Sequence, residues 1–347
     1  MTNETRSRTS VAADVPPGWR AALGLVVALL VAVGVGTLIA KAAGFSRVKD
    51  AILAADSTWF LVCFFAEVAA FGGYAVVVSE ALRWRGGPKV RYGLSVHVTL
   101  ASLGATRVVA AAGAGGLAVT YWCFRRADFS TRDALVRVLG LNTLVYLVFG
   151  VGAWVAALLV TLRVSGRAAL GLTLPWLVVV PLCIVAAHAV TDPARGWSSR
   201  ALDSRSLLRR ALAYAVAGAA WVRDVVPSPE GRRSLAASGV YWAGDVVCLW
   251  AALRSVGVEI PFAEIVLAYA TGYVAMVLPL PFAGVGGVDA AMTFALTGVG
   301  VALAPALVAV AVYRLFGFWV PTIPALAALV LLPRAGRGLE QAAAAPA

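Results

Sequence analysis

Hydrophobic residues are gathered in long runs along the chain, and short polar loops separate these runs. Six runs have the length of a membrane-spanning helix, about 20 residues. They lie near residues 21–43, 59–82, 135–162, 168–190, 235–256 and 303–332. Two further apolar regions, 93–122 and 263–300, are interrupted by glycines. The pattern predicts an all-α polytopic membrane protein with about six full spans and two re-entrant helical hairpins, or with eight spans in all.

A five-residue glycine phrase occurs in both interrupted regions. Ala112–Gly116 is followed, 171 residues later, by the similar phrase Ala283–Gly287. Glycine has no side chain to pack, and irregular backbone at membrane depth is tolerated only where protein or a water-filled cavity surrounds it. We therefore expect a binding site where the two phrases meet. The glycines expected to line it are Gly113, Gly115, Gly116, Gly284, Gly286 and Gly287.

The order span, span, hairpin, span occurs twice, over residues 21–162 and 168–332. The basic residues indicate how the two copies face, because cytoplasmic loops are enriched in Lys and Arg. If both termini are cytoplasmic and each glycine region returns to the side it entered from, the cytoplasmic segments hold 21 basic residues and the outer loops six. The first hairpin then enters from the cytoplasm and the second from outside. This arrangement is an inverted-topology repeat, which is typical of several transporter folds.

The two copies form a single predicted membrane domain, residues 21–332. Residues 1–20 are polar and are expected to be a disordered cytoplasmic tail, and residues 333–347 a second cytoplasmic tail. The cytoplasmic segment 191–233 repeats apolar residues at helical spacing. It fits either a helix in the inner membrane interface or a helix packed on the bundle.

The composition agrees with a membrane protein. The chain has 347 residues, of which 61% are hydrophobic and 13% charged, and a net charge of +12. Its basic residues stand in short loops and not in a soluble basic domain, so they favour membrane orientation and anionic lipids over nucleic acid. Its four cysteines are single and widely spaced, without the clustering of a zinc or redox site. We expect no metal and no cofactor.

Several ionisable residues stand within apolar spans, where such groups are costly and are functional candidates by default. Glu67 and Asp245 lie at similar depths in equivalent spans, and Asp289 follows the second glycine phrase. We expect these acids to balance charge or to carry coupling protons. A purely structural role, pairing with Arg107 or Arg314, is the alternative.

Arg107 and Arg314 are the only basic residues left within the membrane on this topology. A guanidinium binds a phosphate through two parallel hydrogen bonds, which suits the headgroup of a phospholipid or a polyprenyl phosphate. Asn142 and Tyr313 are also 171 residues apart, and we expect them to add hydrogen bonds to the substrate. A structural ion pair or a side chain reaching the interface is an equally plausible role for each arginine.

At this point the sequence resembles a known family. The resemblance rests on Leu278–Asp289 (LPLPFAGVGGVD), the pair Tyr313-Arg314, Trp319–Pro321, and Tyr241–Asp245 (YWAGD). They are similar to the flippase-like membrane domain of lysylphosphatidylglycerol synthetases. The resemblance implies a bundle with re-entrant helices that moves a lipid between leaflets. Asp289 stands where that family usually has Glu.

Larger members of that family carry a soluble aminoacyl-transferase domain after the membrane part, whereas this sequence ends at Ala347. The resemblance therefore does not support synthesis of an aminoacylated lipid. Because the sequence shows no nucleophile motif and no closely spaced acid cluster for a metal, we expect no enzymatic activity. The predicted function is to bind and translocate an anionic phospholipid or a lipid-linked intermediate of the polyprenyl-phosphate type across the plasma (inner) membrane. The alternatives are a membrane-embedded lipid-phosphate transferase and a non-transporting subunit of a cell-envelope lipid enzyme. Expected protein partners are a second copy of the chain or such an enzyme.

Overall fold

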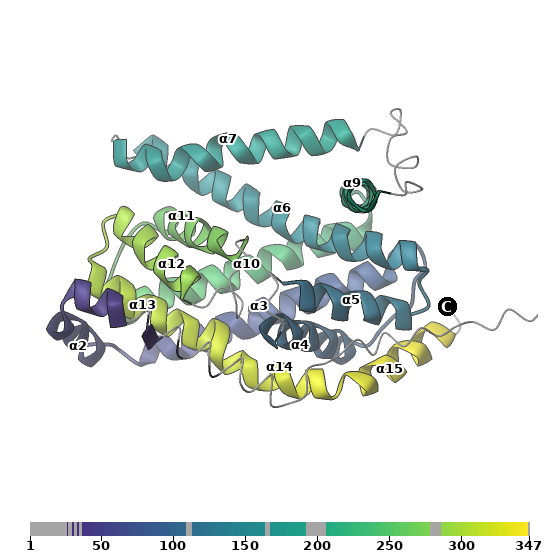
Figure 1. The fold of residues 1–347 in the computed structure, drawn as a ribbon, viewed down its shortest axis with the longest axis horizontal. Coiled ribbons are helices and arrows are strands. Elements are labelled where there is room, and N and C mark those ends of the chain that lie inside the picture. Colours follow the sequence, from purple (N-terminus) through teal and green to yellow (C-terminus); the bar gives the residue numbers. More distant parts are fainter. Residues whose placement is uncertain are drawn as a thin grey trace, which may run out of the picture.

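The fold was examined in a computed structural model. It describes residues 26, 30, 33–34, 37–108, 113–163, 167–191, 206–277 and 286–345. Every regular element within these residues is a helix (Figure 1), so the predicted all-α class is confirmed. Most of the predicted span 21–43 lies outside the described residues.

Within the described residues, five helical segments are long and apolar enough to cross a membrane. They are α3 (Thr58–Arg83), α6 (Thr131–Arg163), α7 (Arg167–Val190), α10 (Pro229–Ser255) and the combined helix Leu303–Val330, which contains α13 (Leu303–Arg314) and α14 (Val320–Val330). Their bounds agree with five of the six predicted spans to within about six residues. The chain is therefore a multi-pass membrane protein.

Two pairs of shorter helices occupy the glycine-containing regions. The first pair is α4 (Tyr92–Val108) and α5 (Ala114–Arg126), and the second is α11 (Phe262–Tyr273) and α12 (Gly287–Gly298). A 12-residue helix is about 18 Å long, well short of the ~30 Å hydrocarbon core of a bilayer. Figure 1 shows these two pairs, the first and the second hairpin, in opposite halves of the bundle.

Glycine makes both turns possible. Gly113 precedes α5 with φ of 85°, and Gly286 precedes α12 with φ of 83°. A residue with a Cβ is strained in this left-handed region. Helices are thus interrupted at corresponding places in the two halves, as the repeated phrase predicts. Gly284 itself lies outside the described residues.

The crossing of α3 and α10 shows the internal symmetry most directly. A Cβ added to Gly73 would lie 2.6 Å from the Ala237 carbonyl oxygen, and one added to Gly244 would lie 2.5 Å from the Ala66 carbonyl oxygen. Gly244 follows Gly73 by 171 residues and Ala237 follows Ala66 by 171. The contact is therefore reciprocal, as expected for two antiparallel helices related by a two-fold axis. Small residues let the backbones approach closely.

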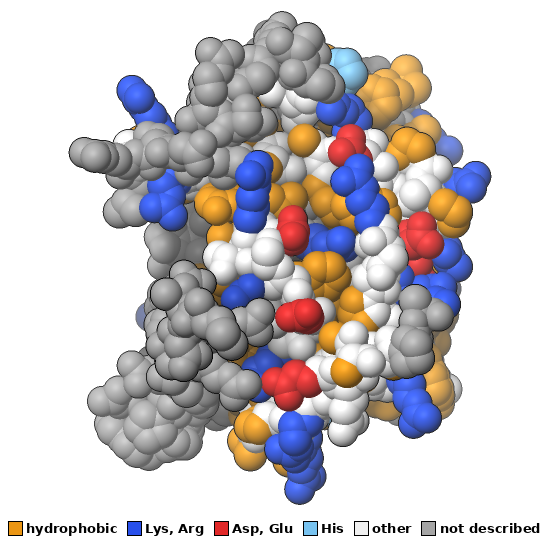
Figure 2. All heavy atoms as spheres, turned by 90° about the vertical axis from the view of Figure 1, so that its right-hand side faces the viewer, with side chains coloured by type: hydrophobic (Ala, Val, Ile, Leu, Met, Phe, Trp, Pro, Cys, Tyr) orange, Lys and Arg blue, Asp and Glu red, His pale blue; other side chains and the backbone are white. Residues whose placement is uncertain are grey.

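Charged side chains gather at one end of the bundle. Figure 2 shows Lys, Arg, Asp and Glu side chains together on the face that forms the right-hand end of Figure 1. Ion pairs there include Arg85–Asp224, at 3.8 Å, and Arg233–Glu80, at 3.3 Å. At this end α15 (Leu332–Ala344) packs on the first hairpin. Glu80 also pairs with Arg83, at 3.3 Å.

The helix predicted within segment 191–233 is α9 (Leu207–Val225). It packs on α6. Its buried residues include Ala213, Val216 and Trp221, whereas Leu208 is exposed. Of the two arrangements considered for this segment, the structure shows the helix packed on the bundle.

Candidate functional site: a polar cluster at a π-helical turn

The last long helix is interrupted near its middle by a π-helical segment, Leu315–Trp319, labelled η4. A π turn is wider than an α turn and occurs often at functional sites, because it changes which backbone groups are free to bind. Arg314 stands directly before this segment and Thr322 three residues after it. Arg107 of the first hairpin contacts the segment itself, and Asp289 of the second hairpin contacts Arg314 directly before it.

Arg107 binds the π turn from the first hairpin. It lies in the last turn of α4 with 4% of its surface exposed. Its Nη1 donates hydrogen bonds to the Phe318 carbonyl oxygen and to Thr322 Oγ1, and its Nη2 donates to the Gly317 carbonyl oxygen at 3.1 Å. The guanidinium therefore ties the tip of α4 to the last long helix, and none of its hydrogen-bond partners among the described residues is acidic.

Arg314 joins the second hairpin to the same place. Its Nε lies 2.6 Å from Asp289 Oδ1. Asp289 Oδ2 accepts a hydrogen bond of 3.0 Å from the Gly286 backbone N–H, which holds the start of α12. The Arg314 Nη2 atom is buried without a hydrogen-bond partner among the described residues. This side chain keeps an unused donor beside its ion pair.

The two acids of the equivalent spans meet at the α3–α10 crossing. Glu67 and Asp245 are 5% and 8% exposed. Tyr269 of α11 donates a hydrogen bond of 2.5 Å to Asp245 Oδ2, and both Glu67 and Tyr313 lie within hydrogen-bonding reach of the Asp245 carboxyl group. Such a pair of carboxyl groups needs a proton or a cation to lie stably in a dry interior.

Glu67 also faces the π turn. A Cβ added to Gly317 would lie 2.9 Å from Glu67 Oε1, and this oxygen has no hydrogen-bond partner among the described residues. The acid pair and the two arginines therefore form one contiguous polar cluster. Its charged members are Arg107, Arg314, Glu67, Asp245 and Asp289.

Most of the site residues predicted from the sequence are thus brought together, including Tyr313, which is buried. Asn142 is not in this group, since its Nδ2 donates to the Val138 carbonyl of its own helix at 2.9 Å. Gly115 and Gly116 are buried in α5, where a Cβ on Gly116 would lie 2.9 Å from the Ser102 carbonyl oxygen. Gly287 begins α12.

Three contributors were missed by sequence analysis: Tyr269, Phe318 and Thr322. Tyr269 stands in an apolar run in which its hydroxyl has no distinguishing neighbour. Phe318 and Thr322 follow Arg314 by four and eight residues, which places all three near one helix face. This spacing could have identified both residues from the sequence. No group of three His, Cys, Asp or Glu that could hold a metal occurs in the part of the chain the structure describes.

The family to which the chain belongs follows from its match to a protein-family model. The sequence matches the family described as lysylphosphatidylglycerol synthase TM region over residues 23–325. The chain belongs to this family. The match includes both hairpins and the π turn, so the whole polar cluster lies within the region shared with the family. No curated protein matches the chain.

Proposed function

We propose that the protein binds and translocates an anionic phospholipid, or a lipid-linked phosphate of the polyprenyl type, between the leaflets of the plasma membrane. The observation that carries this proposal is that Arg107, at the end of α4, and Arg314, paired with Asp289 of α12, lie beside the same π-helical turn. Buried arginines are costly in a membrane, and a phosphate is a ligand that their planar donors fit well.

Arg314 is the residue that would bind the phosphate. Its ion pair with Asp289 involves Nε, and its buried Nη2 has no partner in the described residues. A phosphate that approaches this edge replaces the carboxylate as the anion and takes the unused donor as well. Arg107 is already engaged by three acceptors, so its role is to hold the π turn and to add positive potential beside the phosphate.

The positive charge of the two arginines is balanced by Glu67, Asp245 and Asp289. When Asp289 is displaced from Arg314 by the phosphate, the cluster holds an additional anion, and protonation of a carboxyl group relieves the repulsion. Translocation could in this way be coupled to proton movement through the Glu67–Asp245 pair.

The hairpins supply the access that translocation requires. With both termini in the cytoplasm, as the loop charges favour, the first hairpin is re-entrant from the cytoplasmic side and the second from the outer side. Each hairpin covers the cluster from one side of the membrane, so movement of one at a time exposes the site alternately.

The test is to reconstitute the Arg314→Ala variant in liposomes and to follow a fluorescent phosphatidylglycerol by its accessibility to a membrane-impermeant quencher. Charged hydrogen bonds contribute about 1.5–3 kcal/mol, so we expect translocation to slow by about 10- to 100-fold. The matched control is Arg254→Ala, which removes an arginine paired with the exposed Glu259. Equal rates in the parent and in folded Arg314→Ala protein would refute the proposed role.

A further inference from the structure

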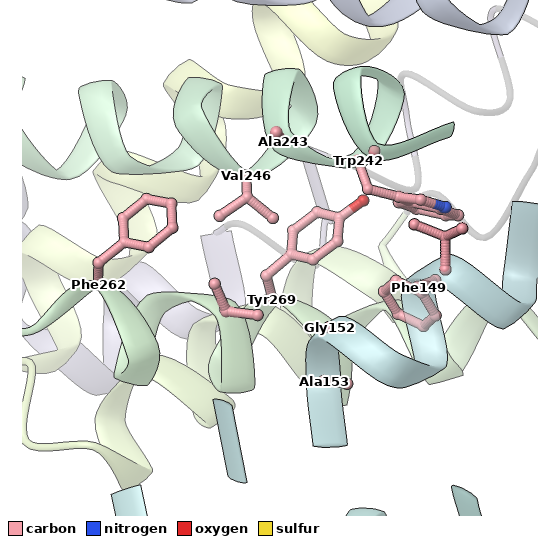
Figure 3. Close-up of a pocket in the computed structure, with 11 residues that line it drawn as sticks. Phe149, Gly152, Ala153, Trp242, Ala243, Val246, Phe262 and Tyr269 are labelled. Atoms are coloured by element: carbon pink, nitrogen blue, oxygen red, sulfur yellow. The ribbon is translucent and has the colours of Figure 1, made fainter. Parts of the chain in front are cut away.

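An open cavity lies between α6, α10 and α11 (Figure 3). Its volume is about 260 Å³. Its lining is hydrophobic, and its larger side chains are Phe149, Trp242, Val246, Phe262, Val266 and Tyr269. It offers an apolar molecule contact on three sides but almost no hydrogen-bonding groups.

The cavity runs along the helices. Phe262, Val266 and Tyr269 lie at positions i, i+4 and i+7 of α11, and at 1.5 Å per residue they cover about 10 Å of its length. The residues of α10 that line the cavity extend over the same number of positions, from Gly239 to Val246. Helices that cross a membrane run roughly along its normal, as lipid chains do, so an extended chain fits this direction.

Two glycines keep the cavity open. A Cβ added to Gly152 of α6 or to Gly239 of α10 would meet no atom within 4 Å. A glycine inside a helix costs about 1 kcal/mol relative to alanine. At the α3–α10 crossing, close backbone contact compensates for that cost, but no described protein atom uses the space beside Gly152 and Gly239. A larger side chain at either position would therefore project into the cavity without meeting a described protein atom.

Tyr269 connects the cavity to the polar cluster. Its ring lines the cavity and its hydroxyl donates a hydrogen bond to Asp245 of α10. In Figure 3 the Tyr269 side chain points from α11 toward α10. One aromatic ring therefore separates the apolar space from the carboxyl pair. A lipid held there has its hydrocarbon chain directly beside the cluster.

We propose that this cavity binds one acyl chain of a phospholipid. The proposal rests on the proposed function and adds a subsite to it, because it assigns a fixed place to the tail of a lipid whose phosphate reaches Arg314. The apolar lining excludes a headgroup, and the direction along the helices suits a single extended chain. Phe262, at one end of the cavity, is 49% exposed, so that end is open to the outside of the protein.

The experiment uses the full chain in phosphatidylglycerol vesicles that contain a trace of phosphatidylglycerol with a photoactivatable diazirine in its acyl chain. After irradiation, labelled peptides are identified by mass spectrometry. We expect labelling of the segments around 148–153 and 239–246. Gly239→Leu and Gly152→Leu each place an isobutyl group in the cavity, and we expect each to reduce this labelling by about tenfold.

Gly171→Leu is the matched control. Gly171 lies on the exposed face of α7, and a Cβ there also meets nothing within 4 Å. The same substitution should leave the labelling unchanged. Labelling that persists in both folded cavity variants would overturn the proposal. Two other results would also overturn it. One is displacement of the probe by a polyprenyl phosphate but not by unlabelled phospholipid. The other is a cavity variant that no longer self-associates but is labelled as strongly as the parent protein.

The outcome is separable from that of the proposed function. Arg314→Ala should lose translocation but keep the acyl-chain labelling, because the cavity contains no part of that side chain. If the parent protein translocates no lipid and yet loses labelling in Gly239→Leu, the acyl-chain site stands and translocation is refuted. If translocation occurs without localised labelling, translocation stands and the acyl-chain site is refuted.

Discussion

Arg107 and Arg314 lie over the same aromatic ring. The Cζ atom of Arg107 is 4.0 Å from the centre of the Phe318 ring, and that of Arg314 is 4.6 Å from it. Two like charges near one ring repel each other unless each is compensated. Carbonyl oxygens of the π turn compensate one of them, and Asp289 compensates the other. This relationship makes the π turn the mechanical link between the two hairpins.

The first prediction concerns the link made by Arg107. Arg107→Lys keeps the charge but cannot reach three acceptors with a planar fork. We expect a loss of about 1.5–3 kcal/mol in stability and faster backbone hydrogen exchange at residues 315–322. Mass-spectrometric hydrogen exchange in detergent measures both the local and the global effect. Unchanged protection of this segment would show that the contacts do not hold the π turn.

The second prediction concerns the ion pair of Arg314 and Asp289. Asp289→Asn leaves a mostly buried guanidinium without its anion, and we expect stability to fall by about 1–3 kcal/mol. The double variant Asp289→Asn/Arg314→Gln should lose less than the sum of the two single variants, with a coupling of about 0.5–3 kcal/mol. Thermal unfolding of the four proteins gives this coupling. Strict additivity would mean that the two side chains do not interact.

The third prediction uses the reciprocal glycines. Alanine at Gly73 or at Gly244 forces α3 and α10 apart, because the new Cβ meets a backbone oxygen at 2.6 or 2.5 Å. Both variants should be destabilised to a similar degree, by about 1–3 kcal/mol. Alanine at the exposed Gly171 should instead be neutral or stabilising by up to ~1 kcal/mol. A large difference between the two crossing variants in thermal unfolding would argue against the two-fold relationship.

The fourth prediction concerns the buried carboxyl pair. If Glu67 and Asp245 carry the coupling proton, Glu67→Gln should retain basal translocation but lose its response to an imposed pH gradient. Glu80→Gln is the matched control on the same helix, since Glu80 is also buried but pairs with Arg83 and Arg233 outside the cluster. Translocation is measured with and without the gradient. A full response in Glu67→Gln would exclude the coupling role.

Much of the architecture could be predicted because membrane insertion imposes a strong pattern on the sequence. Apolar length determines the spans, and the repeated glycine phrase marks both places where helices break. The sequence placed Glu67 and Asp245 at similar depths in equivalent spans. Their meeting follows from the antiparallel crossing of α3 and α10, which brings Ala66 against Gly244. These predictions depend on periodicity and symmetry, which a single sequence displays.

The partners of individual side chains could not be predicted in the same way. The π turn has no residue signature in an apolar helix, so the carbonyl acceptors of Arg107 were not foreseen. Asn142 shares a symmetry offset with Tyr313, yet it binds within its own helix, because the symmetry of the backbone does not extend to every side chain. Tyr269 was missed for a similar reason, since only the packing of α11 on α10 brings its hydroxyl to Asp245.

The proposed translocation requires two hairpins that reach the middle of the membrane from opposite sides. The direct measurement attaches spin labels to Ala114→Cys and Ala290→Cys, in a background in which Cys63, Cys123, Cys183 and Cys248 are replaced, and determines their depth in nanodiscs from collisions with oxygen and with a water-soluble nickel complex. Both labels should lie near the bilayer centre. A label that lies in water at either membrane face would contradict the account, because that hairpin tip would not end beside the π turn.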